Sequence, residues 1–238
     1  MSLFLAYDIE TYRNENCEAY IEAKEYKPDS RLKDPAKIEK NIEDQKAKDY
    51  EKAPLFWWLG KIVCISFVDV SFPEKRWSFY GVDEKKLLID AFTFLEEDKG
   101  GYSLIGKSSK DFDKPFTVGR AMYHDIGVPT HFKDNYLQQQ DVNNIFGFGA
   151  SAGQVTSLDN YAWGLQIQGK TSHGGQVEDM YNRASLGDQE AWKEMVTYCE
   201  QDAWIVAEMV RRYMKIFDPD QWRKKEECIQ DQETEIPF

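Results

Sequence analysis

The sequence predicts an α/β fold in which helices flank a central mixed β-sheet. Two observations predict it: strand-like segments precede a segment with helical spacing, and the C-terminal half is mostly helical. Residues 84–95 carry leucine and alanine at helical spacing, which places the first long helix of this sheet after its third strand. The predicted strands are 3–10, 61–70, 75–80 and 102–106.

Local signals mark the ends of further helices. Asp113-Lys114-Pro115 indicates a helix start, because Asp is favoured at the helix N-terminus and Pro in the first turn. This helix is expected to end near Asp125, before a Gly and a Pro. Ser157 and Asp188 are expected to cap two more helices, the second beginning at Gln189.

A hydrophilic, charge-rich insertion is predicted at 12–54, after the first strand, with a helix candidate from Asp34 to Lys52. The aromatic segment 55–59 (Leu-Phe-Trp-Trp-Leu) follows it and has two interpretations. The favoured one is that its rings anchor the insertion to the core. The other is that they stack on the bases of a single strand.

The domain organisation is expected to be simple. A single domain is placed at 1–217 and a polar, peripheral tail at 218–238. The stretch 143–153 is rich in glycine and is expected to be a flexible loop.

Composition and charge exclude several classes of protein. The formal net charge of −12 argues against holding nucleic acid through a broad basic surface. No apolar run approaches the roughly 18 residues that a membrane span needs, so a cytoplasmic location is expected. The four cysteines form no CxxC pair and the three histidines lack ligand spacing, so neither a zinc site nor a disulfide framework is indicated.

Two carboxylates, Asp8 and Glu10, lie at the end of the first predicted strand. The strand period of two puts them on one face, with Tyr7 and Ile9 on the other. Such a pair can bind a divalent cation and repels itself without one. With 42 acidic residues, roughly seven acid-x-acid patterns are expected by chance, so a strand running out into solvent is the alternative.

Asp113 stands at the predicted transition from strand to helix, where helix caps and metal ligands both occur. As an N-cap it needs no other explanation, and that interpretation stays open beside the one of a metal ligand. Asp111 is close in sequence, but Asp113 is the acid that Phe112 and Pro115 flank, which would fix its direction.

The last predicted helix is the most informative segment. A carboxylate in its apolar stripe, Asp202, needs a partner because desolvating a charge is costly. A metal ion shared with other carboxylates meets this need, and a backbone amide is the alternative. Tyr198 lies one turn before Asp202 and can reach the same site. The stripe, at steps of three or four, is Met195, Tyr198, Asp202, Val206, Met209 and Tyr213.

Taken in order, Asp8-Ile9-Glu10, Phe112-Asp113 and Tyr198-Cys199-Glu200-Gln201-Asp202 resemble the three exonuclease motifs of the DEDD superfamily. Their order makes chance a poor explanation. Thr197 stands where the histidine branch has its His, so the resemblance is to the tyrosine (DEDDy) branch.

The wider sequence resembles the proofreading exonuclease domain of family B DNA polymerases and its free-standing relatives, over most of 1–10 and 60–216. One departure is Ser108, where this family often has Asn. The resemblance implies an RNase H-like fold and a 3′-5′ exonuclease that hydrolyses single-stranded or frayed DNA ends with two Mg²⁺ or Mn²⁺ ions. A separate DNA polymerase is one partner that it suggests.

The same resemblance implies roles for individual residues. Asp8 would bridge both metal ions, Glu10 and Asp202 would hold the ion that carries the attacking water, and Asp113 would support the second ion. Tyr198 would orient the nucleophile. The expected substrate contacts are Thr11, Ser108 and Phe112. Two alternatives remain: a ribonuclease that trims RNA 3′ ends, and a non-catalytic adaptor that binds nucleic acid.

Overall fold

The computed structural model describes residues 3–97, 101–132, 139–145, 157–169, 176–217 and 219. Its centre is a five-stranded sheet in the order β3-β2-β1-β4-β5. The strands β1, β2 and β3 pair antiparallel, whereas β4 and β5 join the sheet parallel to β1. The predicted mixed sheet is therefore confirmed. Its strands are β1 (Leu3–Arg13), β2 (Gly60–Asp69), β3 (Arg76–Tyr80), β4 (Tyr102–Gly106) and β5 (Gln139–Asp141).

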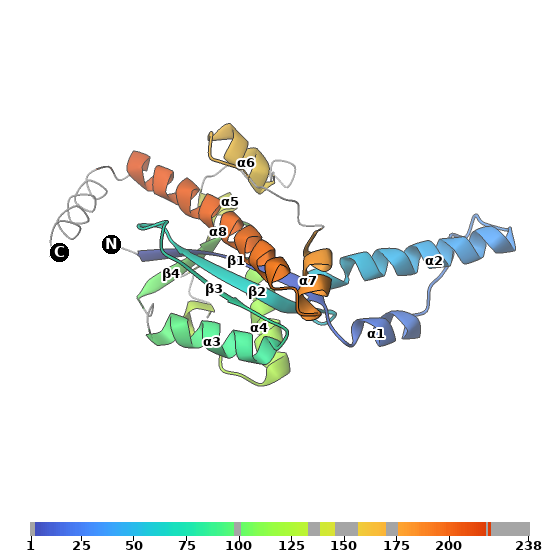
Figure 1. The fold of residues 1–238 in the computed structure, drawn as a ribbon. Coiled ribbons are helices and arrows are strands. Elements are labelled where there is room, and N and C mark those ends of the chain that lie inside the picture. Colours follow the sequence, from blue (N-terminus) through green and yellow to red (C-terminus); the bar gives the residue numbers. More distant parts are fainter. Residues whose placement is uncertain are drawn as a thin grey trace.

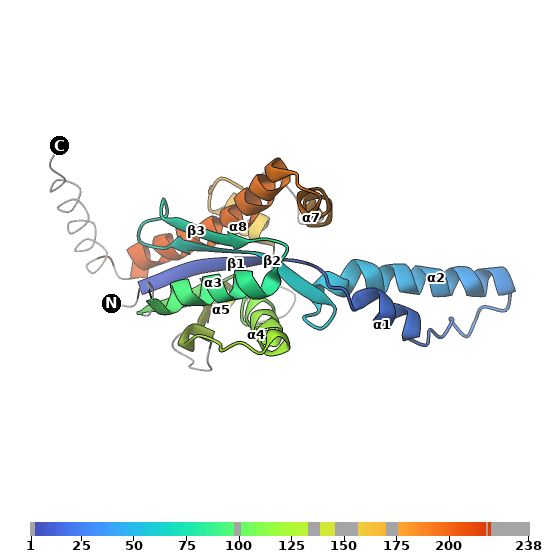
Figure 2. The same ribbon diagram turned by 60° about the horizontal axis from the view of Figure 1, so that its bottom comes forward.

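Helices cover both faces of this sheet (Figures 1 and 2). The long helix α8 (Gln189–Phe217) crosses one face, and α3 (Glu84–Glu97) and α4 (Asp113–His124) lie against the other. Mixed sheets buried on both faces need apolar residues on both sides of their central strands. This arrangement is the RNase H-like α/β fold.

The alternation of side chains along β1 divides them between the two covered faces of the sheet. Leu5, Tyr7 and Ile9 enter the core beneath α3 and α4. Ala6 packs instead in the core that includes α8. Since successive side chains point to opposite faces, Asp8 and Glu10 share the α8 face, as the sequence predicts.

The predicted helix caps are present. Asp34, Ser157 and Asp188 each accept a backbone N–H from the first turn of the following helix. These helices are α2 (Pro35–Lys52), α6 (Leu158–Gly164) and α8. The predicted helix at 113–125 is also present, as α4.

Among the described residues, six short elements were not predicted: β5, the α-helices α1 (Cys17–Ala23), α5 (Val142–Ile145) and α7 (Val177–Ser185), and the 3₁₀ helices η1 (Ala53–Leu55) and η2 (Thr130–Phe132). The loop prediction is wrong for 143–145, because Asp141 accepts the N–H of Asn143 and starts α5 there. Residues 146–153 and, apart from residue 219, the predicted tail 218–238 lie outside the described residues.

The predicted insertion forms an arm of two helices, α1 and α2, that points away from the sheet (Figures 1 and 2). No residue of α2 is buried, so packing at the base attaches the arm. The cluster of buried side chains at that base is small and consists of Cys17, Ile21, Ala53 and Leu59.

The aromatic segment after the arm is only partly buried. Of its side chains Leu59 is buried, whereas the others are 37% to 57% exposed. The ring of Trp57 lies on Gly119 of α4, since a Cβ added there would come within 2.5 Å of it. The anchoring interpretation therefore holds for Leu59 and in part for Trp57. Within the described residues, no helix combines the length and apolarity that crossing a membrane requires.

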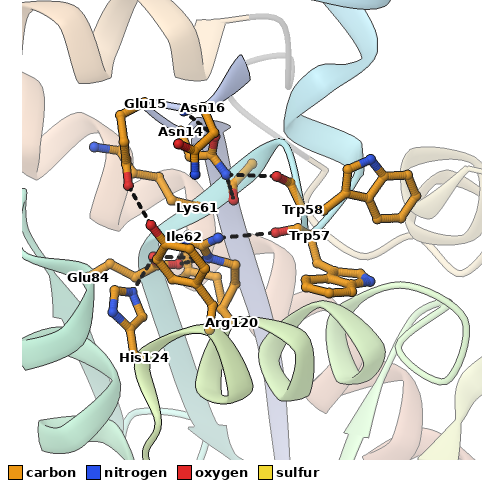
Figure 3. A network of polar contacts seen from close by, with 12 residues as sticks. Asn14, Glu15, Asn16, Trp57, Trp58, Lys61, Ile62, Glu84, Arg120 and His124 are labelled. Atoms are coloured by element: carbon orange, nitrogen blue, oxygen red, sulfur yellow. Dashed lines mark hydrogen bonds and ion pairs between the residues drawn. The ribbon is translucent and has the colours of Figure 1, made fainter. Parts of the chain in front are cut away.

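A buried ion pair joins the helices on the α3 and α4 side to the end of the arm (Figure 3). Arg120, 1% exposed, donates to Glu84 at 2.6 Å, and Glu84 also accepts the backbone N–H of Ile62 at 2.6 Å. His124 contacts the same carboxylate at 2.8 Å, and Arg120 also donates to the carbonyl of Trp57 at 3.2 Å. The network thus ties α3, α4, β2 and the aromatic segment together.

Replacing Arg120 by Met is expected to lower the free energy of unfolding by about 3–5 kcal/mol, because the Glu84 carboxylate then stays buried without its cation. The double variant Glu84→Gln/Arg120→Met should recover part of the loss. Lys86→Met is the control: it removes an exposed pair with Asp90 and should cost less than about 0.5 kcal/mol. Urea unfolding followed by tryptophan fluorescence measures all three. An equal loss of unfolding free energy in Arg120→Met and Lys86→Met would contradict the interpretation of Glu84–Arg120 as a buried ion pair.

Candidate active site

The strand β1 brings Asp8 and Glu10 together. One ligand atom from each lies within 4.8 Å of the other and of the Cys199 sulfur. Glu10 is buried, and the pairing with β2 shifts register directly after it, between Glu10 and Thr11. Such a β-bulge bends the strand and redirects the side chains beside it. The two acids are thus a pair on the rigid centre of the sheet.

Asp113 reaches this pair through the backbone of β1. Strand β4 pairs with β1 only as far as Ala6, and among the described residues no strand pairs with β1 on that side beyond Ala6. There the backbone N–H of Ile9 donates to the Asp113 carboxylate, which is 3% exposed. The side chain of Asp113 therefore lies at the residue between Asp8 and Glu10.

The interpretation of Asp113 as a simple helix cap is wrong. Phe112 occupies the N-cap position of α4 and Asp113 is the first helical residue. A carboxylate at N1, unlike an N-cap side chain, does not have to accept an N–H from the first turn of its own helix, so it can turn toward β1. Asp111, its neighbour in sequence, is exposed.

Burial raises the pKa of Asp113 to about 7, and the nearby charge of Asp141 adds to the effect. Hydrogen bonds from the backbone N–H groups of Asp113 and Ile9 act in the opposite direction. In the protein alone, Asp113 is therefore partly protonated at neutral pH. A cation at this position would favour its ionised form.

The helix α8 places Tyr198 and Asp202 against the same side of the sheet. Both are buried, at 5% and 6% exposed, which agrees with the predicted apolar stripe. Between them Cys199 lies next to Asp8, with its sulfur 3.4 Å from the Asp8 carbonyl oxygen and 3.8 Å from a carboxylate oxygen. This contact joins α8 to β1 at Cys199, which lies between Tyr198 and Asp202 along the helix.

Two residues of the site were missed from the sequence, Cys199 and Asp141. Burial raises the pKa of the Cys199 thiol well above its usual range, so the thiol keeps its proton and donates to Asp8. Asp141, at the end of β5, is 4% exposed and accepts the backbone N–H groups of Lys110 and Asn143. Its strand, Gln-Gln-Asp, has no apolar alternation from which to predict it.

The three predicted substrate contacts lie around the acids in different settings. The Thr11 hydroxyl donates to the carbonyl of Pro54 at 2.7 Å. Ser108 has a left-handed backbone, φ 60°, and its hydroxyl accepts from the side-chain amide of Asn143 at 3.1 Å. An amide thus lies beside the position where the resembled family often carries Asn. Phe112 is half-buried and packs against Phe116.

The donor set fits a hard divalent cation. Carboxylate oxygens are the ligands that Mg²⁺ and Mn²⁺ prefer, and a protonated, buried thiol is a poor ligand for either. Among the described residues, the cysteines Cys17, Cys64 and Cys199 are buried and not joined in disulfides. Cys228 lies outside the described residues.

A scan against protein-family models gives no match, and a search of curated proteins gives none either. Among solved structures, the fold is similar to that of the family B DNA polymerase from the hyperthermophilic archaeon Pyrobaculum calidifontis. The TM-score is 0.57 and the sequence identity 14%, over 90% of this chain. The matched part is 25% of the polymerase chain. At this identity the likeness supports the fold alone.

Without divalent ions, the parent protein is expected to lose stability as pH rises from about 4 to 7. The folded state holds the Asp113 proton up to a pKa of about 7, whereas the unfolded chain releases it near 3.8, so the unfolded state binds fewer protons in this window. Each unit of pKa shift corresponds to about 1.4 kcal/mol, so the loss amounts to a few kcal/mol.

Asp113→Asn should remove this part of the pH dependence, and Asp111→Asn, at an exposed position, should leave it unchanged. Urea unfolding in EDTA at a series of pH values provides the comparison. Identical slopes for the parent and Asp113→Asn would show that burial does not perturb Asp113.

Proposed function

We propose that this chain is a metal-dependent 3′-5′ exonuclease that hydrolyses phosphodiester bonds at single-stranded or frayed 3′ ends, with DNA as the favoured substrate. One observation carries the proposal: the Asp113 carboxylate accepts the N–H of Ile9, between Asp8 and Glu10, whose ligand atoms lie within 4.8 Å of each other. Two of these acids stand on β1, and the third contacts its backbone from the start of α4. The order of the sequence motifs supports the same activity.

In this proposal, Asp8, Glu10, Asp113 and Asp202 hold two Mg²⁺ or Mn²⁺ ions. When bound, such ions lower the pKa of water and stabilise the charge that develops on the entering and leaving oxygens. The chain supplies rigidity: Asp8 and Glu10 stand on a strand paired with β2, and Asp113 is held by a backbone N–H. The Cys199 thiol orients Asp8 by donating to it.

Tyr198 is proposed to position the attacking water. It is buried beside Cys199, which contacts Asp8, so its place on α8 is fixed by packing. A neutral phenol, with an ordinary pKa near 10, is a poor general base but a good hydrogen-bonding group. Holding the nucleophile in line is therefore the role that suits it.

Incubation with 5′-labelled DNA and RNA single strands of equal sequence, in Mg²⁺, Mn²⁺ or EDTA, is expected to give a metal-dependent ladder that shortens from the 3′ end. Asp8→Ala should slow it more than about 100-fold, since losing a group that only hydrogen-bonds to a metal ligand already costs about 10- to 100-fold. Asp111→Ala, at an exposed acid, should retain the parent rate. No cleavage of either strand in any metal would refute the nuclease and favour a non-catalytic adaptor.

Tyr198→Phe is expected to lower the single-turnover rate by about 10- to 100-fold, because the water is then less well oriented. Mn²⁺ affinity, measured by titration calorimetry, should stay unchanged, since no metal ligand is lost. Tyr213→Phe is the matched control, about 22 Å farther along α8. A loss of Mn²⁺ affinity in Tyr198→Phe, or an unchanged rate, would each rule out a positioning role.

A further inference from the structure

A group of aromatic rings lies open on the surface at the end of the arm. We call Phe56, Trp57 and Trp58 the aromatic platform; their exposed fractions are 37%, 38% and 46%. The rings of Phe56 and Trp58 are stacked, with centroids 4.9 Å apart and an interplanar angle of 29°. Trp57 meets Trp58 edge-on at 5.8 Å. Three adjacent large rings that remain this exposed form an apolar surface patch, and such patches mark sites of interaction with another molecule.

The backbone beneath the platform is held by donors from two other elements. Asn14, at the end of β1, donates to the carbonyl of Trp58 at 3.1 Å, and Arg120 of α4 donates to that of Trp57 at 3.2 Å. Figure 3 shows the side chains of Trp57 and Trp58 pointing away from this polar network. Trp57 also rests on Gly119. The platform is therefore ordered before any ligand binds, which lowers the entropy cost of binding.

Two short paths along the chain connect the platform with the residues of the candidate active site. Thr11, which directly follows Glu10, donates to the carbonyl of Pro54, two residues before Phe56. Gly119, under the ring of Trp57, is six residues after Asp113, or about 9 Å along the axis of α4. Both connections are short and rigid, so the rings and the acids keep a fixed relation to each other.

The segment that carries the platform has no acidic side chain of its own. Residues 52–63 include Lys52 and Lys61 and no carboxylate, in a chain whose net charge is −12. The Lys61 ammonium bonds to the hydroxyl of Tyr181. Phosphates can therefore approach the platform without meeting an acidic side chain from its own segment.

We propose that the aromatic platform binds the bases of a single-stranded nucleic acid while its 3′ end lies at the candidate active site. This inference rests on the proposed function and adds where the strand is held. Stacking on aromatic rings tolerates any base, as an enzyme that shortens a strand stepwise requires, and needs no extended basic surface. A duplex keeps its bases stacked inside the helix, so the platform selects unpaired ends.

Binding of a 5′-labelled oligothymidylate, followed by fluorescence anisotropy in the Asp8→Ala background without divalent ions, tests this. Trp58→Ala should weaken binding by about 5- to 150-fold, and Trp58→Phe should keep most of the affinity. Trp163→Ala is the matched control, because Trp163 is 84% exposed on α6, and it should bind like the parent. An abasic strand of equal length should bind the parent as weakly as oligothymidylate binds Trp58→Ala.

Equal affinity for the abasic strand and for oligothymidylate would refute the proposal that the aromatic platform binds bases. This comparison uses the parent chain, so it applies even if Trp58→Ala fails to fold. Unchanged binding by a folded Trp58→Ala variant would refute the proposal as well. If light scattering shows that Trp58→Ala dissociates a dimer without changing strand binding, the rings form an interface between copies instead. In each of these cases metal-dependent shortening by the parent would leave the proposed function intact. A parent that neither binds nor shortens a strand would refute both.

Discussion

The arrangement of the acids depends on the unequal lengths of two neighbouring strands. Strand β1 continues to Arg13, whereas its pairing with β4 stops at Ala6. A buried backbone N–H needs an acceptor, and none of the strands in the described part of the chain supplies one to Ile9 on the β4 side. The Asp113 carboxylate does so, which draws the start of α4 onto β1 at the residue between Asp8 and Glu10. The need of the Ile9 N–H for an acceptor therefore explains why Asp113 lies against β1.

This arrangement has a cost that a cation would relieve. Burial of Asp113, together with the nearby charge of Asp141, raises its pKa to about 7. Sites that concentrate carboxylates in this way lower the stability of the protein alone in exchange for affinity toward a metal ion. The Cys199 thiol contributes a neutral donor to Asp8, which orients the carboxylate without adding charge.

A second polar centre lies just past the C-terminal end of β1, beyond Glu10. The Glu84–Arg120 pair is buried on α3 and α4 and reaches the carbonyl of Trp57, while Asn14 holds the neighbouring carbonyl (Figure 3). The arm enters and leaves the domain here, through the small cluster that contains Leu59. Because α4 carries both Arg120 and Asp113, one helix contacts the backbone of the aromatic platform and also supplies one of the site acids.

The sequence by itself determined what depends on local periodicity and capping. The strand alternation that puts Asp8 and Glu10 on one face, the stripe that buries Tyr198 and Asp202, and the caps of three helices could all be predicted. The helix α7 could also have been found, because Val177, Met180, Tyr181 and Ala184 recur at i, i+3, i+4 and i+7. Only the tertiary structure decided that Asp113 accepts the N–H of Ile9 in β1 and does not cap α4. It also decided that Cys199 contacts Asp8 and that Asp141 lies buried near Asp113. These outcomes depend on contacts between residues as much as 191 positions apart, for which local patterns carry no information.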